Sequence, residues 1–356
     1  MKQIKRLMIL CGGISPEHEI SLNSAESVFN GAHAHFSVSL CKICKDGAIE
    51  VFDGISADFH SGRQSPFKKG RSCVDVVRLS EILTAAPCVA FSVIHGACGE
   101  DGGLQGLLET LNIPFVGSSI MASSVAMDKD ITKRLLREAG IRVLDSVTMR
   151  RSEAAATNYG DITLKLGGQV FVKPANGGSS IGVSRVEDEA SFACAIKEAL
   201  RFDDKILIER RTSGRELECC VIGNGEFHAS GVGEVIPRHP FYSYDAKYMD
   251  PDGAAVTVPA ALDPHMETRV RNIAIAVAKT LGCQGLARVD LFLENESDIY
   301  VNEVATIPEF TVDSMCARLW EASGLSYPAL IQRLVELAIE RHEQVNRLTY
   351  VFEIEN

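Results

Sequence analysis

Short apolar runs alternate with helical patterns along the first third of the chain. Residues 5–10 form one apolar run that ends at Gly12-Gly13, and residues 88–94 form another that ends at His95-Gly96. Helical patterns follow over residues 21–36 and 104–111. Strands that alternate with helices predict a parallel sheet, whose ligands bind beyond the carboxyl ends of the strands. Both glycine-rich turns fall at that edge, whereas polar residues 54–71 predict a loop.

The remaining two thirds of the chain have a different order of elements. Strands are predicted over residues 169–173, 205–209, 216–222, 285–293 and 299–305. Helices are predicted from a cap at Asp130 to Ala139, over 267–281, and from Ser326 onward. Gly223-Asn224-Gly225 is typical of a hairpin turn. We therefore expect a mixed α/β (α+β) fold in three domains, which comprise residues 1–117, 118–211 and 212–356.

Composition restricts the classes of partner. The chain has 356 residues and a formal net charge of -11. An acidic surface argues against nucleic acid or an anionic membrane as the main partner. No apolar run is long enough to span a bilayer, and the N-terminal one is too short for a signal peptide, so we expect a cytoplasmic protein. The 11 cysteines are expected to be reduced, mostly buried thiols, and packing is favoured over zinc or redox chemistry at Cys41-x-x-Cys44.

Two acidic residues mark the last pair of predicted strands. The short connection from Asn295 to Asp298 would place Asp290 opposite Glu303, with Arg288 on the same face as Asp290. Facing carboxylates repel each other unless a positive charge lies between them. Mg²⁺ favours carboxylate oxygens together with substrate phosphates, so this pair predicts a metal site. A solvated sheet face that happens to carry acids is the alternative.

A lysine and a flexible loop form the second candidate feature. Lys173 ends a predicted strand, and Gly177-Gly178-Ser179-Ser180 follows it. Backbone N–H groups of such a loop can surround phosphate oxygens, and the lysine adds a point charge. The segment is not a Walker motif, and a surface turn is the alternative.

Three further segments carry polar groups in irregular, glycine-rich or aromatic contexts. They are His95 to Gly106, Gly12 to Glu19, and Phe241 to Tyr248. The second resembles the opening turn of a dinucleotide-binding fold, but its glycine spacing is wrong, which leaves a nicotinamide enzyme as a weak alternative. The third predicts a loop that closes over a ligand, with a packed aromatic loop as the alternative.

Taken in order, these motifs resemble those of the D-alanine–D-alanine ligases across nearly the whole chain. The matching segments are Gly12-Gly-x-Ser-x-Glu17-x-Glu-Ile-Ser-Leu, His95-Gly-x-x-Gly-Glu-Asp-Gly-x-Leu-Gln-Gly, Lys173-Pro…Gly-Ser-Ser-x-Gly182, Tyr244-Asp-Ala-Lys247-Tyr248, Arg288-Val-Asp290 and Asn302-Glu303-Val304. The resemblance implies an ATP-grasp fold that holds ATP between the second and third domains. It also implies two small D-amino acids as substrates and a homodimer.

The resemblance further implies a role for individual residues. Those implied to bind ATP are Lys129, Lys173, Ser180, Glu209, Arg211, Glu216 and Lys247. Asp290 and Glu303 would hold Mg²⁺, with Mn²⁺ as the alternative ion. The ammonium group of the first amino acid would lie by Glu17, in a network with Ser179 and Tyr248 and near His95.

The implied reaction proceeds through an acyl phosphate. The carboxylate of the first amino acid takes the γ-phosphoryl group, and the amine of the second then attacks. Arg288 would stabilise the tetrahedral oxyanion, and Ser314 with Glu309 would lie at the second amino acid.

The chain departs from the family pattern at the metal and acceptor motif. Ala305 replaces an asparagine that gives an oxygen to a second magnesium, and Glu309 replaces a glycine. Three interpretations stay open at this point: a D-alanine–D-alanine ligase, a ligase with a different amine acceptor, and a weakly active protein that binds ATP. The matching donor-side residues favour a small D-amino acid as donor.

Overall fold

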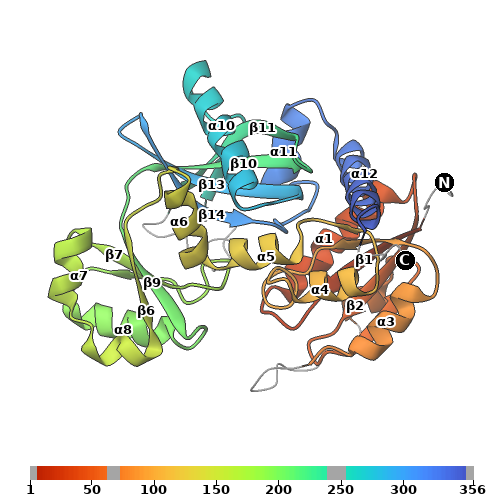
Figure 1. Ribbon diagram of the computed structural model, residues 1–356, viewed down its shortest axis with the longest axis horizontal. Coiled ribbons are helices and arrows are strands. Elements are labelled where there is room, and N and C mark those ends of the chain that lie inside the picture. The colour runs from red at the N-terminus through yellow and green to blue at the C-terminus, as the bar shows by residue number, and fades with distance from the viewer. Residues whose placement is uncertain (1–5, 62–72, 239–253, 350–356) are drawn as a thin grey trace, which may run out of the picture.

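Three β-sheets organise the protein, whose computed structural model describes residues 6–61, 73–238 and 254–349. In Figure 1 they lie in a row, with the N-terminal sheet at one end, the sheet of β6, β7 and β9 at the other, and the third sheet between them. The predicted mixture of helices and strands is confirmed, and the exact limits of the three domains stay a prediction.

The first sheet has the strand order β3-β2-β1-β4-β5, and its strands are parallel except for β3. Its strands are β1 (Arg6–Gly12), β2 (Ser37–Ile43), β3 (Ile49–Phe52), β4 (Val89–Ser92) and β5 (Phe115–Val116). Its helices are α1 (His18–Ala32), α2 (Ala57–Ser61), α3 (Val76–Thr84) and α4 (Gly103–Thr110). Apolar side chains of β1 are buried on both faces, which explains its uninterrupted apolar run.

Two expectations for this region were wrong in detail. Helix α1 begins at His18 and ends at Ala32, so it starts and stops earlier than its apolar pattern predicts. The polar stretch from residue 54 includes the short helix α2, because Phe59 is buried in an edge-on contact with Phe52.

The second sheet is antiparallel, with the order β6-β9-β7-β8. Its strands are β6 (Ser146–Arg150), β7 (Val170–Pro174), β8 (Ser184–Val186) and β9 (Lys205–Arg210). The helical elements in and before this part are α5 (Ile120–Met127), α6 (Lys129–Glu138), η1 (Arg151–Ala156), α7 (Tyr159–Leu166) and α8 (Glu189–Ala199). Asp128 caps α6, not Asp130 as the sequence predicts, because the Asp128 side chain accepts the N–H groups of Asp130 and Ile131. Asp130 instead accepts hydrogen bonds from Arg134 and Thr148.

The third sheet is also antiparallel, with the order β12-β11-β10-β13-β14. Its strands are β10 (Arg215–Gly223), β11 (Phe227–Pro237), β12 (Ala254–Thr257), β13 (Gly285–Glu294) and β14 (Asp298–Ala305). Its helices are α10 (Pro264–Thr280), α11 (Met315–Ala322) and α12 (Tyr327–Asn346). One face of this sheet packs in an apolar cluster with α10, and the opposite face carries Glu218, Asp290 and Glu303.

The C-terminal helix α12 returns to the first sheet, as Figure 1 shows. Leu330 and Leu334 of α12 belong to the same buried cluster as Leu7 and Ile9 of β1. Arg341 donates hydrogen bonds to the backbone carbonyls of Phe115 and Gly117 at the end of β5. Among the residues described, no helix is both long and apolar enough to cross a bilayer.

The expectation that every cysteine is reduced was wrong for one pair. Cys220 of β10 and Cys316 of α11 form a disulfide whose Cα atoms lie 5.9 Å apart. The two residues are 96 positions apart in the chain, so sequence spacing carries no signal of the pairing. Cys41 and Cys44 are both fully buried free thiols, and Cys41 lies on β2.

Replacing Cys316 with serine is expected to lower the free energy of unfolding by about 4–5 kcal/mol, because the cross-link restricts the unfolded chain over a long loop. Urea denaturation under non-reducing conditions measures the change. Cys73→Ser is the matched control, since Cys73 is an exposed free thiol. Equal stability of the two variants would contradict the expectation.

Candidate active site

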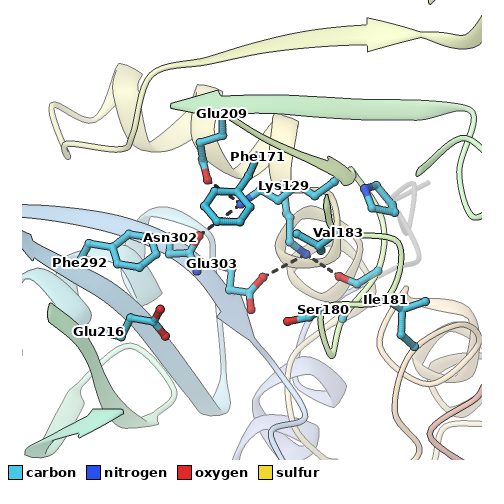
Figure 2. Close-up of a pocket in the computed structure, with 14 residues that line it drawn as sticks. Lys129, Phe171, Ser180, Ile181, Val183, Glu209, Glu216, Phe292, Asn302 and Glu303 are labelled. Carbon is cyan, nitrogen blue, oxygen red and sulfur yellow. Dashed lines mark hydrogen bonds and ion pairs between the residues drawn. The ribbon is translucent and has the colours of Figure 1, made fainter. Parts of the chain in front are cut away.

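A pocket of about 150 Å³ lies where the second and third sheets meet. Residues of the Gly/Ser loop, of β7 and β9, and of β13 and β14 line it, and Figure 2 shows their side chains converging. Two aromatic rings, Phe171 and Phe292, enter the same pocket. The loop takes a sharp form, because Ser179 and Ser180 adopt left-handed backbone angles, with φ of 51° and 58°.

Lys129, the first residue of α6, connects the loop to the third sheet. Its Nζ donates a hydrogen bond to the Gly177 carbonyl at 2.5 Å and lies 3.1 Å from Glu303 Oε2 (Figure 2). The α6 backbone around it is fixed by the Asp128 cap. A lysine held at a loop of this kind is well placed to meet a phosphate group.

Lys173 of β7 takes part in a buried network. Its Nζ donates hydrogen bonds to Glu209 Oε2 at 2.7 Å and to Asn302 Oδ1 at 3.3 Å. The other oxygen of Glu209 pairs with Lys133 of α6, whose side chain is 1% exposed. One carboxylate therefore balances two buried ammonium groups.

The pKa directions in this network follow from that arrangement. Burial favours the neutral form of Glu209, but Lys133 and Lys173 outweigh burial and lower its pKa. Burial lowers the pKa of Lys133 to about 8, although Glu209 opposes the shift. The two shifts differ in origin because Glu209 has two cationic partners, whereas Lys133 has one anionic partner and a second lysine nearby.

The two carboxylates on β13 and β14 face each other, as the short connection predicts. Asp290 pairs with Glu303, and Glu218 of β10 pairs with Asp290, so the three acids form a row on one face of the sheet. The next row contains Arg288 opposite Ala305. Glu218, Asp290, Glu303 and Arg288 are therefore neighbours on one face of the sheet.

Arg288 holds this face together electrostatically. Its Nε and Nη2 donate to the two oxygens of Asp290, each at 2.7 Å, and Nε lies 3.1 Å from Glu218 Oε2. Burial opposes the guanidinium charge, but Asp290 and then Glu218 outweigh it and raise the pKa of Arg288. The side chain therefore stays a cation beside the carboxylate pair.

Asp290 and Glu303 fit a hard divalent cation by their chemistry, since both are carboxylates on adjacent strands. Within the described residues no group of three or more His, Cys, Asp or Glu side chains is placed to bind a metal. Protein oxygens would thus form part of the coordination shell, with nucleotide phosphates and water completing it. Ala305 offers only a methyl group, beside a smaller cavity of about 50 Å³ that Glu100 and Lys129 also line.

Glu17 connects the first sheet to the Gly/Ser loop. It is a buried carboxylate just before α1, and the Ser179 hydroxyl donates a hydrogen bond to it. Glu100 lies nearby and accepts the Gly96 N–H at 2.7 Å. Burial, reinforced by Glu17, raises the pKa of Glu100 to about 8, so this carboxyl is largely neutral near pH 7.

His95 is buried at the same junction. Its Nδ1 donates a hydrogen bond to the Ile307 carbonyl at 3.0 Å, and burial lowers the pKa of its imidazole. Its Nε2 is buried and has no hydrogen-bond partner among the described residues. The side chain is therefore a neutral imidazole with one nitrogen that can accept a hydrogen bond.

The remaining residues predicted from the sequence lie in or near the pocket, or outside the described residues. Ser314 caps α11 and accepts the Ala317 N–H at 3.4 Å. The Arg211 side chain donates a hydrogen bond to Gln169 Oε1, whereas Glu216 and Ser180 line the pocket. Lys247 and Tyr248 lie outside the described residues.

Two residues of this site were missed by sequence reasoning. Lys133 lies four positions after Lys129 on α6, and Glu218 lies two positions after Glu216 on β10. The four-residue spacing on the helix and the two-residue spacing on the strand each place both residues on one face of their element. Those spacings were the signals in the sequence that could have identified Lys133 and Glu218. Both residues meet their partners only through packing between elements distant in sequence.

Comparison with known proteins gives consistent matches over the chain. Residues 6–118 match the family described as D-ala D-ala ligase N-terminus, and residues 135–336 match D-ala D-ala ligase C-terminus. The chain is 44% identical to D-alanine--D-alanine ligase A of Escherichia coli K12, over 96% of this chain and 98% of that protein.

Two solved structures are similar along almost their whole length. The D-alanine-D-alanine ligase of Coxiella burnetii has a TM-score of 0.78 at 34% identity, covering 96% of this chain and 97% of that one. The VanG D-Ala:D-Ser ligase of Enterococcus faecalis has a TM-score of 0.82 at 32% identity, covering 94% and 100%.

Proposed function

The chain belongs to the D-alanine–D-alanine ligase family, and we propose that it joins two molecules of D-alanine while converting ATP to ADP and phosphate. The observation that carries this proposal is the convergence of Lys129, Lys173 and Glu303 on one pocket. Asp290 lies opposite Glu303 on the adjacent strand, and Glu17 is hydrogen-bonded to Ser179 of the Gly/Ser loop. The family is ATP-dependent, and its fold is the ATP-grasp fold.

ATP would bind in the 150 Å³ pocket between the second and third sheets. Phe171 and Phe292 offer apolar surfaces to the adenine, with Glu209, Arg211 and Glu216 near its edge and ribose. Lys129, Lys173 and the backbone at Ser180 would contact the phosphates, and family resemblance adds Lys247. Asp290 and Glu303 would hold Mg²⁺, which when bound neutralises phosphate charge.

The first D-alanine would bind where the Gly/Ser loop meets the first sheet. Its ammonium group would pair with Glu17, which Ser179 orients, with His95 nearby and, by family resemblance, Tyr248. Its carboxylate then lies toward Lys129 and takes the γ-phosphoryl group. Arg288 stabilises the oxyanion that forms when the second amine attacks the acyl phosphate, and Ser314 receives the second carboxylate.

The product, D-alanyl-D-alanine, is a component of peptidoglycan precursors, so we place the protein in cell-wall synthesis. We propose a cytoplasmic location, where ATP is available, and a homodimer, as expected from family resemblance. Small D-amino acids are its partners in this proposal.

Purified protein given ATP, Mg²⁺ and D-alanine is expected to release ADP and form D-alanyl-D-alanine in equal amounts. Coupled ADP detection and mass spectrometry measure the two products. Parallel reactions with D-serine or other amines as second substrate test for a different acceptor. Nucleotide binding without ADP release under every condition would contradict the proposal and favour a binding protein.

A further inference from the structure

The Gly/Ser loop has an unfavourable backbone form that needs support from its surroundings. Ser179 and Ser180 both have left-handed backbone angles, with φ of 51° and 58°, a region that residues other than glycine rarely occupy. Gly177 and Gly178 precede them and have no side chain that could pack and fix the loop. Such a form persists only where neighbouring groups determine it, so the contacts at the two ends of the loop matter.

Asp203 holds the first end of the loop. It lies in the turn between α8 and β9, and its Oδ2 accepts hydrogen bonds from the Asn176 backbone N–H at 2.8 Å and from the Asn176 side-chain amide at 2.9 Å. Its Oδ1 accepts the Lys205 N–H at 3.1 Å, which fixes the carboxylate within its own turn. Hydrogen bonds to a charged acceptor are stronger than neutral ones, so Asp203 fixes the residue that precedes the two loop glycines.

Phe202, the neighbouring residue in the same turn, holds the other end of the loop. An added Cβ at Gly182 would lie 2.6 Å from Phe202 Cδ2 and 3.0 Å from Pro174 Cγ, so the ring rests directly on the Gly182 backbone. Gly182 also has a φ of +71°. Glycine is therefore favoured at this position both by its backbone angle and by the ring that packs on it.

The same turn is connected to Lys129, which contacts the loop from the pocket side. The Lys205 carbonyl accepts the Ala175 N–H at 2.9 Å, and the Ala175 carbonyl accepts the Lys129 N–H at 3.0 Å. The Lys205 ammonium group also pairs with Asp128, the cap of α6. A shift of the turn would therefore move the loop and Lys129 together, and both line the candidate nucleotide pocket (Figure 2).

We propose that Phe202 and Asp203 are positioning residues that hold the Gly/Ser loop in the form that binds nucleotide phosphates. This inference rests on the proposed function and extends it, because the two residues act from outside the residues that line the pocket. Without them the loop samples other forms, and nucleotide binding must first restore the left-handed serines. The apparent affinity falls in proportion to the fraction of molecules whose loop has the binding form.

Asp203→Ala tests the support at the first end of the loop. Calorimetric titration with adenylyl imidodiphosphate and Mg²⁺ is expected to show a roughly tenfold rise in Kd, because two hydrogen bonds to Asn176 are lost. Asp203→Asn should recover part of the affinity, since its amide oxygen can still accept the Asn176 N–H. Asp204→Ala is the matched control, because Asp204 lies in the same turn but its side chain is 80% exposed and pairs with Arg151.

Hydrogen exchange of the loop amides provides a measurement that does not depend on activity. The Ile181 and Val183 N–H groups bond to carbonyls of the loop itself, so their exchange reports opening of the loop and not the lost contact with the turn. Both amides should exchange roughly tenfold faster in Asp203→Ala and in Phe202→Ala. Amides of β7 and β9 should stay as protected as in the unsubstituted protein, and the control variant should leave both loop amides unchanged.

An unchanged Kd in Asp203→Ala, or unchanged exchange of the two loop amides, would overturn the inference. Equal losses in Asp203→Ala and Asp204→Ala would also overturn it, as would faster exchange throughout the second sheet, since either result indicates a general loss of stability. An unsubstituted protein that binds no nucleotide defeats the proposed function. The exchange comparison then decides alone whether the turn holds the loop.

Discussion

Exchanging Glu303 for glutamine is expected to lower kcat for ADP release by roughly 10³-fold, which corresponds to about 4 kcal/mol of transition-state stabilisation. Glu303 lies directly opposite Asp290 and is 3.1 Å from the Lys129 ammonium group. The amide keeps the size of the side chain but removes its negative charge. It therefore weakens the divalent ion's binding and leaves Lys129 without its anionic partner.

Steady-state ADP release over a range of Mg²⁺ concentrations measures this effect. The Mg²⁺ concentration needed for half-maximal rate should rise along with the loss in kcat. Glu296→Gln is the matched control, because Glu296 is exposed in the turn that joins β13 to β14. A loss smaller than about tenfold would show that Asp290 and the phosphates hold the ion without Glu303.

Exchanging Glu209 for glutamine is expected to lower the free energy of unfolding at neutral pH by roughly 3–5 kcal/mol. The side chains of Lys133, Lys173 and Glu209 are 1%, 9% and 5% exposed. Removing the carboxylate leaves two ammonium groups buried together without a counter-charge. This loss exceeds that of a surface ion pair, because solvent screens the latter.

The loss of unfolding free energy in Glu209→Gln should become smaller as pH rises. The pKa of Lys133 is lowered from 10.5 to about 8 in the folded protein, so the unfolded chain binds more protons between those values. Stability due to this group therefore rises with pH across that window. In the variant an unpaired lysine can shed its proton, which relieves the repulsion at high pH.

Urea denaturation at neutral pH and near pH 9.5 measures both effects. The double variant Glu209→Gln/Lys133→Met should recover part of the stability, because it removes one of the buried charges. Glu138→Gln, at the exposed end of α6, is the control. A loss in Glu209→Gln that is the same at both pH values would argue against buried lysine charge as its cause.

The pairing of the two candidate metal ligands could be predicted because it depends on local rules. Alternation along a strand and a short connection fix which residues of two neighbouring strands face each other, and Asp290 does pair with Glu303. The glycine-rich turns and the hairpin after β10 follow similarly from backbone constraints. These features need no knowledge of distant parts of the chain.

Other features depend on packing between distant segments. A lysine in a helix is usually a solvated residue, and only the approach of β9 to α6 turns Lys133 into the partner of Glu209. The Cys220–Cys316 disulfide joins elements 96 residues apart. The two candidate caps of α6, Asp128 and Asp130, differ by two positions, and only the backbone geometry decides between them.

The return of α12 to the first sheet has a consequence for how the chain is made. Leu7 and Ile9 of β1 are synthesised long before Leu330 and Leu334, which complete the cover of that apolar face. Until those residues leave the ribosome, that face is covered only in part, by residues such as Leu22 and Val28 of α1, and its remainder is open to water and to other nascent chains. Chaperone protection during elongation would therefore matter more for this protein than for one whose first unit closes on itself.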